Sequence, residues 1–230
     1  MTSWVHFSFQ DASSPVMEEF VLFHDVIMVC LGFIVVSVGG VLWAVLAEGP
    51  YVGGLIDGQW LEWIWTALPG LVLFGVAMPS LCLLYMYDEM TNFDLGVKVY
   101  GYQWYWSYEI PLVEGLSIDS FMAPSSDLYG GQCRLLETDV PLTLPIKSMI
   151  QLMISSKDVL HAWAVPSLGV KMDAVPGRIN TLSMYSFRPG VYFGQCSEIC
   201  GAHHSFMPIM LEMVSVGDFA DWVKLSDDSE

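Results

Sequence analysis

The sequence predicts a hairpin of two transmembrane helices followed by an all-β sandwich, and three observations carry this prediction. The 230-residue chain has a mean hydropathy of +0.50 and only 14% charged residues, which is unusual for a soluble protein. Two long runs near its start, 26–47 and 64–86, contain no charged side chain. From Lys98 onward, short β-rich runs alternate with Pro and Gly, as in a sandwich.

Residues 1–25 precede the first uncharged run and form a predicted outer segment. They are polar, aromatic and acidic. They lack the basic start of a secretory signal and the Arg-rich character of a transit peptide. We therefore expect a mature protein, or one that is made inside its own compartment.

Residues 26–87 form the predicted hairpin. A run of about 22 residues makes a helix roughly 33 Å long at ~1.5 Å per residue, which is enough to cross a bilayer. A Gly-rich connection, 48–63, joins the two runs, so both ends of the hairpin lie on one side of the membrane. No Lys or Arg flanks either run, so charge bias does not orient the hairpin. Glu62 directly precedes the second run, where a helix dipole favours a solvated carboxylate.

Residues 88–216 form the predicted β domain, whose size of about 130 residues is enough for one core. The run 140–145 contains two prolines, which favours a strand at a sheet edge. Residues 217–230 are predicted to be an acidic tail. The clearest β-rich runs are 97–100, 134–137, 150–154, 179–186 and 209–214.

An aromatic segment, YQWYWSYE at 102–109, lies in the first part of this domain and holds three consecutive aromatic residues at 104–106. Three consecutive aromatic residues are usually core residues. In a strand, Trp104 and Trp106 would share one face and Tyr105 would occupy the other.

The chemistry of the chain concentrates in the loop 194–207. It places two thiols, Cys196 and Cys200, four residues apart, with His204 four residues later and Met207 three after that. Thiolate, thioether and imidazole together suit copper. Because each of two thiolates can bridge two metals, the loop carries enough sulfur for a dinuclear copper centre.

Three other interpretations of the loop remain open from its residues alone. A disulfide between Cys196 and Cys200 needs an oxidising compartment and leaves His204 and Met207 unexplained. A zinc site of two Cys and two His has a common spacing, but Met is a poor zinc ligand. Simple packing explains any one of these residues, since Met and Cys fill cores readily, but it explains the whole set poorly.

The net charge of −17 makes nucleic acid an unsuitable partner and favours a basic protein instead. The five cysteines do not form the pattern of a disulfide framework. All eight Lys and Arg lie at Lys98 or later.

Several segments, in the same order, resemble subunit II of cytochrome c oxidase. They are DVLHAWAVPSL at 158–168, GQCSEICG at 194–201, HSFMP at 204–208 and the aromatic segment at 102–109. The similarity extends from about residue 18 to about residue 216. It implies a cupredoxin-like Greek-key sandwich on the outer side of the membrane, beside subunit I and other oxidase subunits.

The resemblance implies a ligand set for a dinuclear copper A centre. Cys196 and Cys200 would bridge the metals, and His161 and His204 would bind one copper each. Met207 would bind one copper weakly, and the backbone carbonyl of Glu198 would bind the other. The Glu198 side chain would bind magnesium at the boundary with subunit I. His203 stands beside His204 but does not match the ligand position, so we expect it to play no part in binding copper.

The resemblance also implies roles away from the copper. Trp104 would receive electrons from cytochrome c, and Glu62 would lie near a proton entrance. The electrons would pass to haem in subunit I, where oxygen is reduced to water and protons are pumped. The acids expected on the docking surface are Glu109, Glu114, Asp119, Asp139 and Asp158.

Two rival functions are a copper-free quinol oxidase subunit II and a copper chaperone. The five side-chain ligands argue against the first. The membrane spans and the aromatic segment are unnecessary for the second. We expect the mitochondrial inner membrane, with the copper domain in the intermembrane space, rather than a bacterial plasma membrane.

Overall fold

The computed structural model describes residues 8–49, 57–88, 92–112 and 116–227. The chain divides into two compact units. One unit is Glu19–Met86, and the other joins Met1–Glu18 to Tyr87–Glu230.

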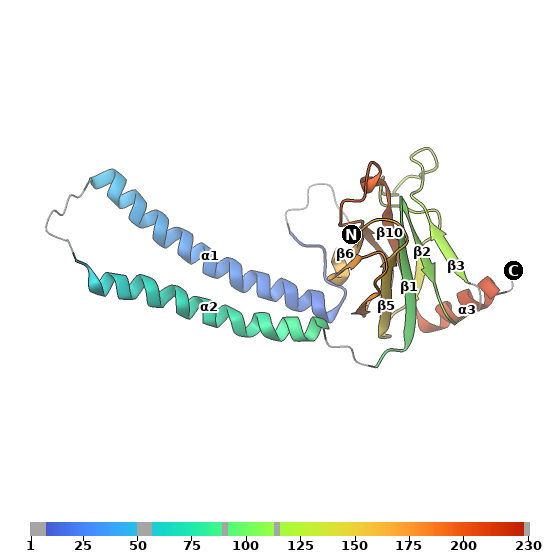
Figure 1. Cartoon of the computed structure of the whole chain (residues 1–230), viewed down its shortest axis with the longest axis horizontal. Helices are drawn as coiled ribbons and strands as arrows, with labels where there is room; N and C mark the ends of the chain where they lie inside the picture. Colours follow the sequence, from blue (N-terminus) through green and yellow to red (C-terminus); the bar gives the residue numbers. More distant parts are fainter. Residues whose placement is uncertain (1–7, 50–56, 89–91, 113–115, 228–230) are drawn as a thin grey trace. The chain divides into compact units, whose positions relative to one another are not determined.

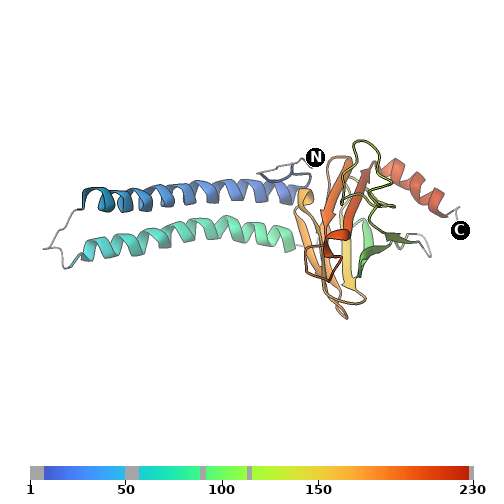
Figure 2. The same ribbon diagram turned by 90° about the horizontal axis from the view of Figure 1, so that it is seen from above.

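Two antiparallel helices, α1 (Pro15–Glu48) and α2 (Gln59–Asp88), make up the helical unit and lie side by side in both views (Figures 1 and 2). Both are long and apolar enough to cross a membrane, and most of their large apolar side chains are exposed. The two predicted runs are therefore helical. Residues 50–56 of the predicted connection lie outside the described residues, and Glu62 lies in the first turn of α2.

The helix α1 begins before the predicted span, so the end of the predicted outer segment is helical. Ser14 supplies the reason, because its hydroxyl accepts a hydrogen bond from the Met17 N–H at 3.0 Å and caps the first turn. Pro15 follows at a position where a helix needs no N–H donor. Hydropathy misses this start, because the charged residues Glu18, Glu19 and Asp25 separate it from the uncharged run.

The β domain contains a five-stranded sheet with the order β3-β2-β1-β5-β8. Its strands are β1 (Leu95–Tyr102), β2 (Tyr105–Glu109), β3 (Ser117–Ser120), β5 (Ile150–Ser156) and β8 (Asn180–Met184). The pair β1–β5 is parallel, and the other neighbours are antiparallel.

A second sheet has the order β4-β10-β9, with strands β4 (Leu142–Pro145), β9 (Gly190–Gln195) and β10 (Pro208–Val214). The predicted edge strand is confirmed, because β4 lies at the edge of this sheet. A two-stranded ribbon pairs β6 (His161–Val165) with β7 (Val170–Ala174) through the short helix η1 (Pro166–Leu168).

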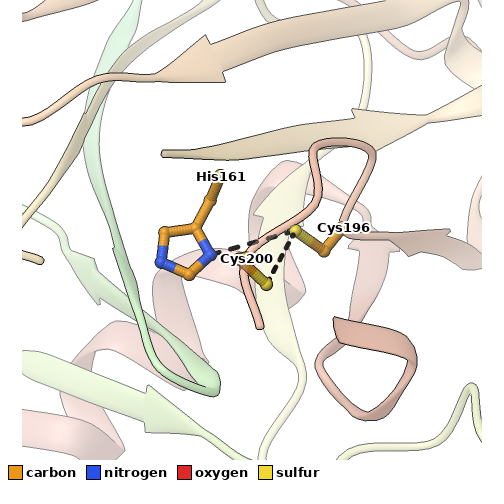
Figure 3. A group of neighbouring side chains, drawn as sticks. All are labelled: His161, Cys196 and Cys200. Carbon is orange, nitrogen blue, oxygen red and sulfur yellow. Dashed lines mark hydrogen bonds between the residues drawn. The ribbon is translucent and has the colours of Figure 1, made fainter. Parts of the chain in front are cut away.

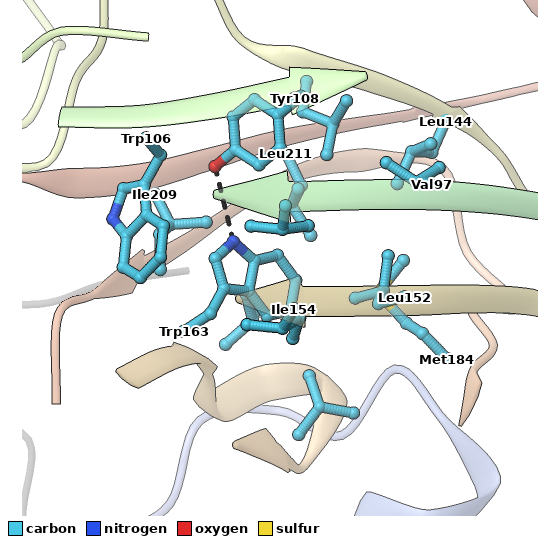
Figure 4. Packing of buried hydrophobic residues seen from close by; sticks show 14 of the residues in the cluster. Val97, Trp106, Tyr108, Leu144, Leu152, Ile154, Trp163, Met184, Ile209 and Leu211 are labelled. Carbon is cyan, nitrogen blue, oxygen red and sulfur yellow. Dashed lines mark hydrogen bonds between the residues drawn. The ribbon is translucent and has the colours of Figure 1, made fainter. Parts of the chain in front are cut away.

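The core lies where alternate residues of these strands meet, and Figure 4 shows a part of it that includes Trp106, Tyr108 and Trp163. Strand β1 alternates strictly between buried and half-buried residues, which is why the run 97–100 could be predicted as a strand. Trp163 and Tyr108 are fully buried, and the Trp163 indole donates a hydrogen bond to the Tyr108 hydroxyl at 3.3 Å. Burial raises the pKa of Tyr108 well above its ordinary value.

Two predicted elements differ from the structure. Residues 134–137 form a turn, because the N–H groups of Leu136 and Glu137 both donate to the Cys133 carbonyl. The predicted tail contains a helix, α3 (Val216–Asp227). The Ser215 hydroxyl accepts a hydrogen bond from the Asp218 N–H and caps α3. Phe219 is buried against the core, which holds the helix in place.

Candidate metal centre

The predicted ligands come together at one end of the β domain, as Figure 3 shows for three of them. His161 opens β6, whereas the two thiols lie in the loop between β9 and the short helix η2 (His204–Phe206). The loop leaves β9 close to β6 because residue 194 is glycine. A Cβ at Gly194 would lie 2.0 Å from the Ala164 carbonyl oxygen, so any side chain here would push the two strands apart.

The two thiols form the centre of the cluster. The Cys196 and Cys200 sulfurs are 3.9 Å apart. Cys196 Sγ lies 3.9 Å from His161 Nδ1, and Cys200 Sγ lies 3.4 Å from His204 Nδ1. Each sulfur therefore has its own imidazole, which is the symmetry that a thiolate-bridged pair of metals requires.

The remaining two predicted ligands complete the set. The Met207 thioether sulfur lies 3.5 Å from Cys200 Sγ, and the Glu198 carbonyl oxygen lies 3.3 Å from Cys196 Sγ. The thioether lies beside Cys200 and the carbonyl lies beside Cys196, so these two donors fit a pair of metals better than a single metal. The thiols, His161 and Met207 are all buried, so the donors face a dry space.

Two of the alternative interpretations fit this geometry poorly. A disulfide needs sulfur atoms about 2.05 Å apart, and both thiols are free here. A closed zinc site uses four ligands in a tetrahedron. It would leave Met207 without a role, although its sulfur points at the cluster. The donor set therefore fits a dinuclear copper site.

Asp158 orients the His161 ring from behind. His161 Nε2 lies 2.8 Å from Asp158 Oδ1, which leaves Nδ1 facing Cys196. A carboxylate on the far nitrogen is a common support for a metal-binding imidazole. The ring also packs against Gly101, where a Cβ would lie 2.8 Å from His161 Cδ2. This glycine therefore makes room for the imidazole of His161.

The pKa values of the two thiols diverge. Two opposing effects act on the pKa of Cys196. Burial raises it, but hydrogen bonds from His161 and from backbone N–H groups lower it by more, so that the pKa falls to about 7. Burial and the charge on Cys196 raise the pKa of Cys200 to about 12. Burial also raises the pKa of Asp158, but its hydrogen bonds to His161, Val159 and Gln103 outweigh that effect and hold it below its ordinary value.

Trp104 lies beside the loop, although not as predicted. A two-residue turn of Gln103 and Trp104 joins the end of β1 to the start of β2. Trp104 therefore lies outside both strands and does not share a strand face with Trp106. The prediction failed because the hairpin reverses within the aromatic segment. Gln103 Nε2 donates to the Cys200 carbonyl at 2.8 Å, and a Cβ at Gly201 would lie 3.1 Å from Trp104 Cζ2. The indole thus contacts the residue that follows Cys200.

The predicted docking acids differ in their exposure to solvent and in their bonding partners. Glu109 forms an ion pair with Lys98 at 3.0 Å, whereas Asp119 is exposed on β3. Asp139 is exposed and accepts hydrogen bonds from the N–H groups of Phe121 and Val140. Asp158 is engaged with His161, and Glu114 lies outside the described residues.

An aromatic depression surrounds Trp104, and no pattern in the sequence indicated it. Its side chains come from three separate segments, so no spacing along the chain links them. The depression has a volume of about 340 Å³ and is open to solvent. It is lined by Gln103, Trp104, Tyr105, Phe121, Met122, His203 and Phe206.

Comparisons with known proteins agree with this geometry. Residues 95–214 match the family described as cytochrome c oxidase subunit II, periplasmic domain, and residues 2–83 match its transmembrane domain. The periplasmic domain of subunit II of cytochrome oxidase from Bradyrhizobium japonicum is 40% identical, with a TM-score of 0.57. That match covers 61% of this chain and 99% of the other.

A second solved structure is a mixed disulfide intermediate between a thioredoxin-like protein and subunit II of cytochrome c oxidase. It is 38% identical, has a TM-score of 0.53, and covers 62% of this chain and 96% of the other.

Proposed function

This chain belongs to the cytochrome c oxidase subunit II family, and from that premise we propose that it carries electrons from a cytochrome c to the haem of subunit I. It is a membrane-anchored subunit of a haem-copper oxidase, with two spans and a periplasmic-type domain. Reduction of oxygen to water and proton pumping would take place in the complex.

The observation that carries the proposal is the pairing of each central thiol with its own imidazole. His161, Cys196, Cys200, His204 and Met207 would hold two coppers, with the Glu198 carbonyl as the sixth donor. When bound, the copper pair supplies a one-electron centre in which both metals share the charge. The chain contributes the ligand geometry, the Asp158 support behind His161 and the exclusion of water by burial.

Electrons would reach this centre through Trp104. Its indole is part of an open depression and touches Gly201, next to the ligand Cys200. Exposed Asp119 and Asp139 would attract a basic cytochrome c, as would the net charge of −17. Glu109 and Asp158 would contribute less directly, because each already has an internal partner.

The copper-free quinol oxidase subunit remains the alternative function. Such a subunit needs the sandwich but does not need five side-chain ligands that converge on one buried space. Their convergence favours cytochrome c as the donor.

Three further proposals concern magnesium, proton uptake and the location of the protein. The Glu198 carboxylate would bind magnesium at the subunit I boundary, and Glu198→Gln should remove that ion while copper stays bound. Glu62 would lie near a proton entrance, and Glu62→Gln should slow proton uptake. The membrane would be the mitochondrial inner membrane, with the copper domain in the intermembrane space. Labelling that domain in intact organelles tests this location.

The test of the main proposal compares electron donors on the purified oxidase. Reduced cytochrome c should drive oxygen consumption, whereas a quinol should not. Trp104→Phe should lower the rate with cytochrome c by roughly tenfold or more without loss of copper, because a misplaced donor group costs heavily. Trp222→Phe, on α3, is the matched control and should have no effect. Turnover with quinol alone would reject the proposal.

A further inference from the structure

The Trp104 indole is unusual because its polar atom is buried and unpaired. Among the residues that the structure describes, its Nε1–H meets no hydrogen-bond acceptor. A buried N–H without a partner favours any rotation that brings it to water. No polar contact therefore fixes the orientation of this ring, and packing alone must hold it.

The indole packs against the buried core of the β domain, and two neighbours from the loop 194–207 contact it as well. Gly201 lies against one part of the indole, with a φ of +126° that side chains rarely adopt. The His203 imidazole meets the indole edge-on, with 4.7 Å between ring centroids and an angle of 70° between the planes. Aromatic pairs prefer this arrangement. Phe206 in turn contacts His203 edge-on at 5.7 Å.

His203 also has a particular place in the chain. It precedes the ligand His204 directly, and it is exposed at the rim of the depression. His204 Nδ1 points to Cys200 Sγ, whereas the His203 ring points to Trp104. The two adjacent imidazoles therefore serve different partners, one inside the metal centre and one outside it.

We propose that His203 is a positioning residue for electron transfer, which holds the Trp104 indole against the loop that carries the copper ligands. This inference rests on the proposed function, in which Trp104 is the point where electrons enter. Without the imidazole, the indole could turn its N–H to solvent and lose contact with Gly201. The contact needs an aromatic ring at position 203 but no particular charge.

The experiment uses the full chain labelled with 5-fluorotryptophan, and the purified oxidase for kinetics. The Trp104 resonance is assigned with Trp104→Phe. In His203→Ala this resonance should shift and broaden, and kcat with cytochrome c should fall several-fold. KM, its salt dependence and the copper spectrum should not change. His203→Phe keeps a ring at this position and should restore both the resonance and kcat.

Three results would overturn the inference. The first is a His203→Ala variant with an unchanged resonance and kcat. The second is a His203→Phe variant that is as slow as the Ala variant with a raised KM, since the imidazole would then contact the partner itself. The third is loss of copper from His203→Ala. A different result would reject the proposed function instead. If Trp104→Phe is fully active while His203→Ala still loosens the indole, electrons do not enter through Trp104, although His203 does hold the indole in place.

Discussion

The two adjacent histidines show how one residue decides the chemistry of the loop. The spacing of thiols and imidazoles allows either His203 or His204 as a ligand, and the resemblance selected His204. Of these two adjacent imidazoles, only that of His204 lies beside a thiol, with its Nδ1 3.4 Å from Cys200 Sγ. His204→Ala should therefore abolish the copper absorption spectrum, whereas His203→Ala should leave it intact. The assignment fails if the effects of the two substitutions are reversed.

Gly101 offers a second test at this scale. Its added Cβ would press on the His161 ring at 2.8 Å, so Gly101→Ala must displace this proposed metal ligand. We expect weaker copper binding and a loss of about 1–3 kcal/mol in the free energy of unfolding. Gly96→Ala, in the same strand, is the control, because its Cβ would meet only the flexible end of Met153 at 3.4 Å. Copper titration and thermal melts measure both variants, and equal effects would contradict the account.

Copper loading should depend on pH, because copper binds thiolates rather than thiols. The pKa of Cys196 is lowered to about 7, and that of Cys200 is raised. As pH falls through 7, a proton returns to Cys196 and competes with the metal. Copper affinity should therefore fall by roughly tenfold or more between about pH 8 and about pH 6. Competition titrations with a chelator measure this, and a flat profile would argue against thiolate ligation.

At the scale of elements, α3 is a part of the β domain and not a loose tail. Phe219 is 7% exposed and packs on the core, whereas Leu225 is 71% exposed. Phe219→Ala should lower the free energy of unfolding by about 3 kcal/mol, because it leaves a cavity. Leu225→Ala should change little. Denaturant unfolding of the two variants decides the matter, and equal stabilities would show that α3 does not support the core.

Hydropathy and alternation explain which elements could be predicted. The uncharged runs predicted both helices, and apolar residues at alternate positions predicted strands such as β1. The failures occur where a polar cap or a turn decides the structure. Ser14 starts α1 early, Ser215 starts α3, and the Cys133 carbonyl folds an apparent strand into a turn.

The candidate site divides in the same way. Its donor atoms are concentrated in one loop, so their chemistry could be predicted from residue types and from family resemblance. The surroundings of Trp104 could not be predicted, because Phe121 and His203 come to the same depression from distant segments of the chain. Contacts that depend on the tertiary fold leave no periodic pattern in the chain.

At the scale of the whole molecule, charge should set the rate of partner encounter. The net charge of −17 favours a basic donor, and the association rate should fall as ionic strength rises. Asp119→Asn should lower the second-order rate constant at low salt, and the effect should shrink at high salt. Asp221→Asn on α3 removes the same charge elsewhere and should have a smaller effect. Stopped-flow kinetics across a salt series distinguish the two, and identical losses would place the docking surface elsewhere.

The central claim is that one loop and one upstream histidine hold two coppers that share a single electron. The most direct measurement is the copper content of the loaded chain together with its electron spin resonance spectrum. The account predicts two coppers per chain and one unpaired electron distributed equally over both. One isolated copper, bound zinc, or a Cys196–Cys200 disulfide in the folded chain would contradict it.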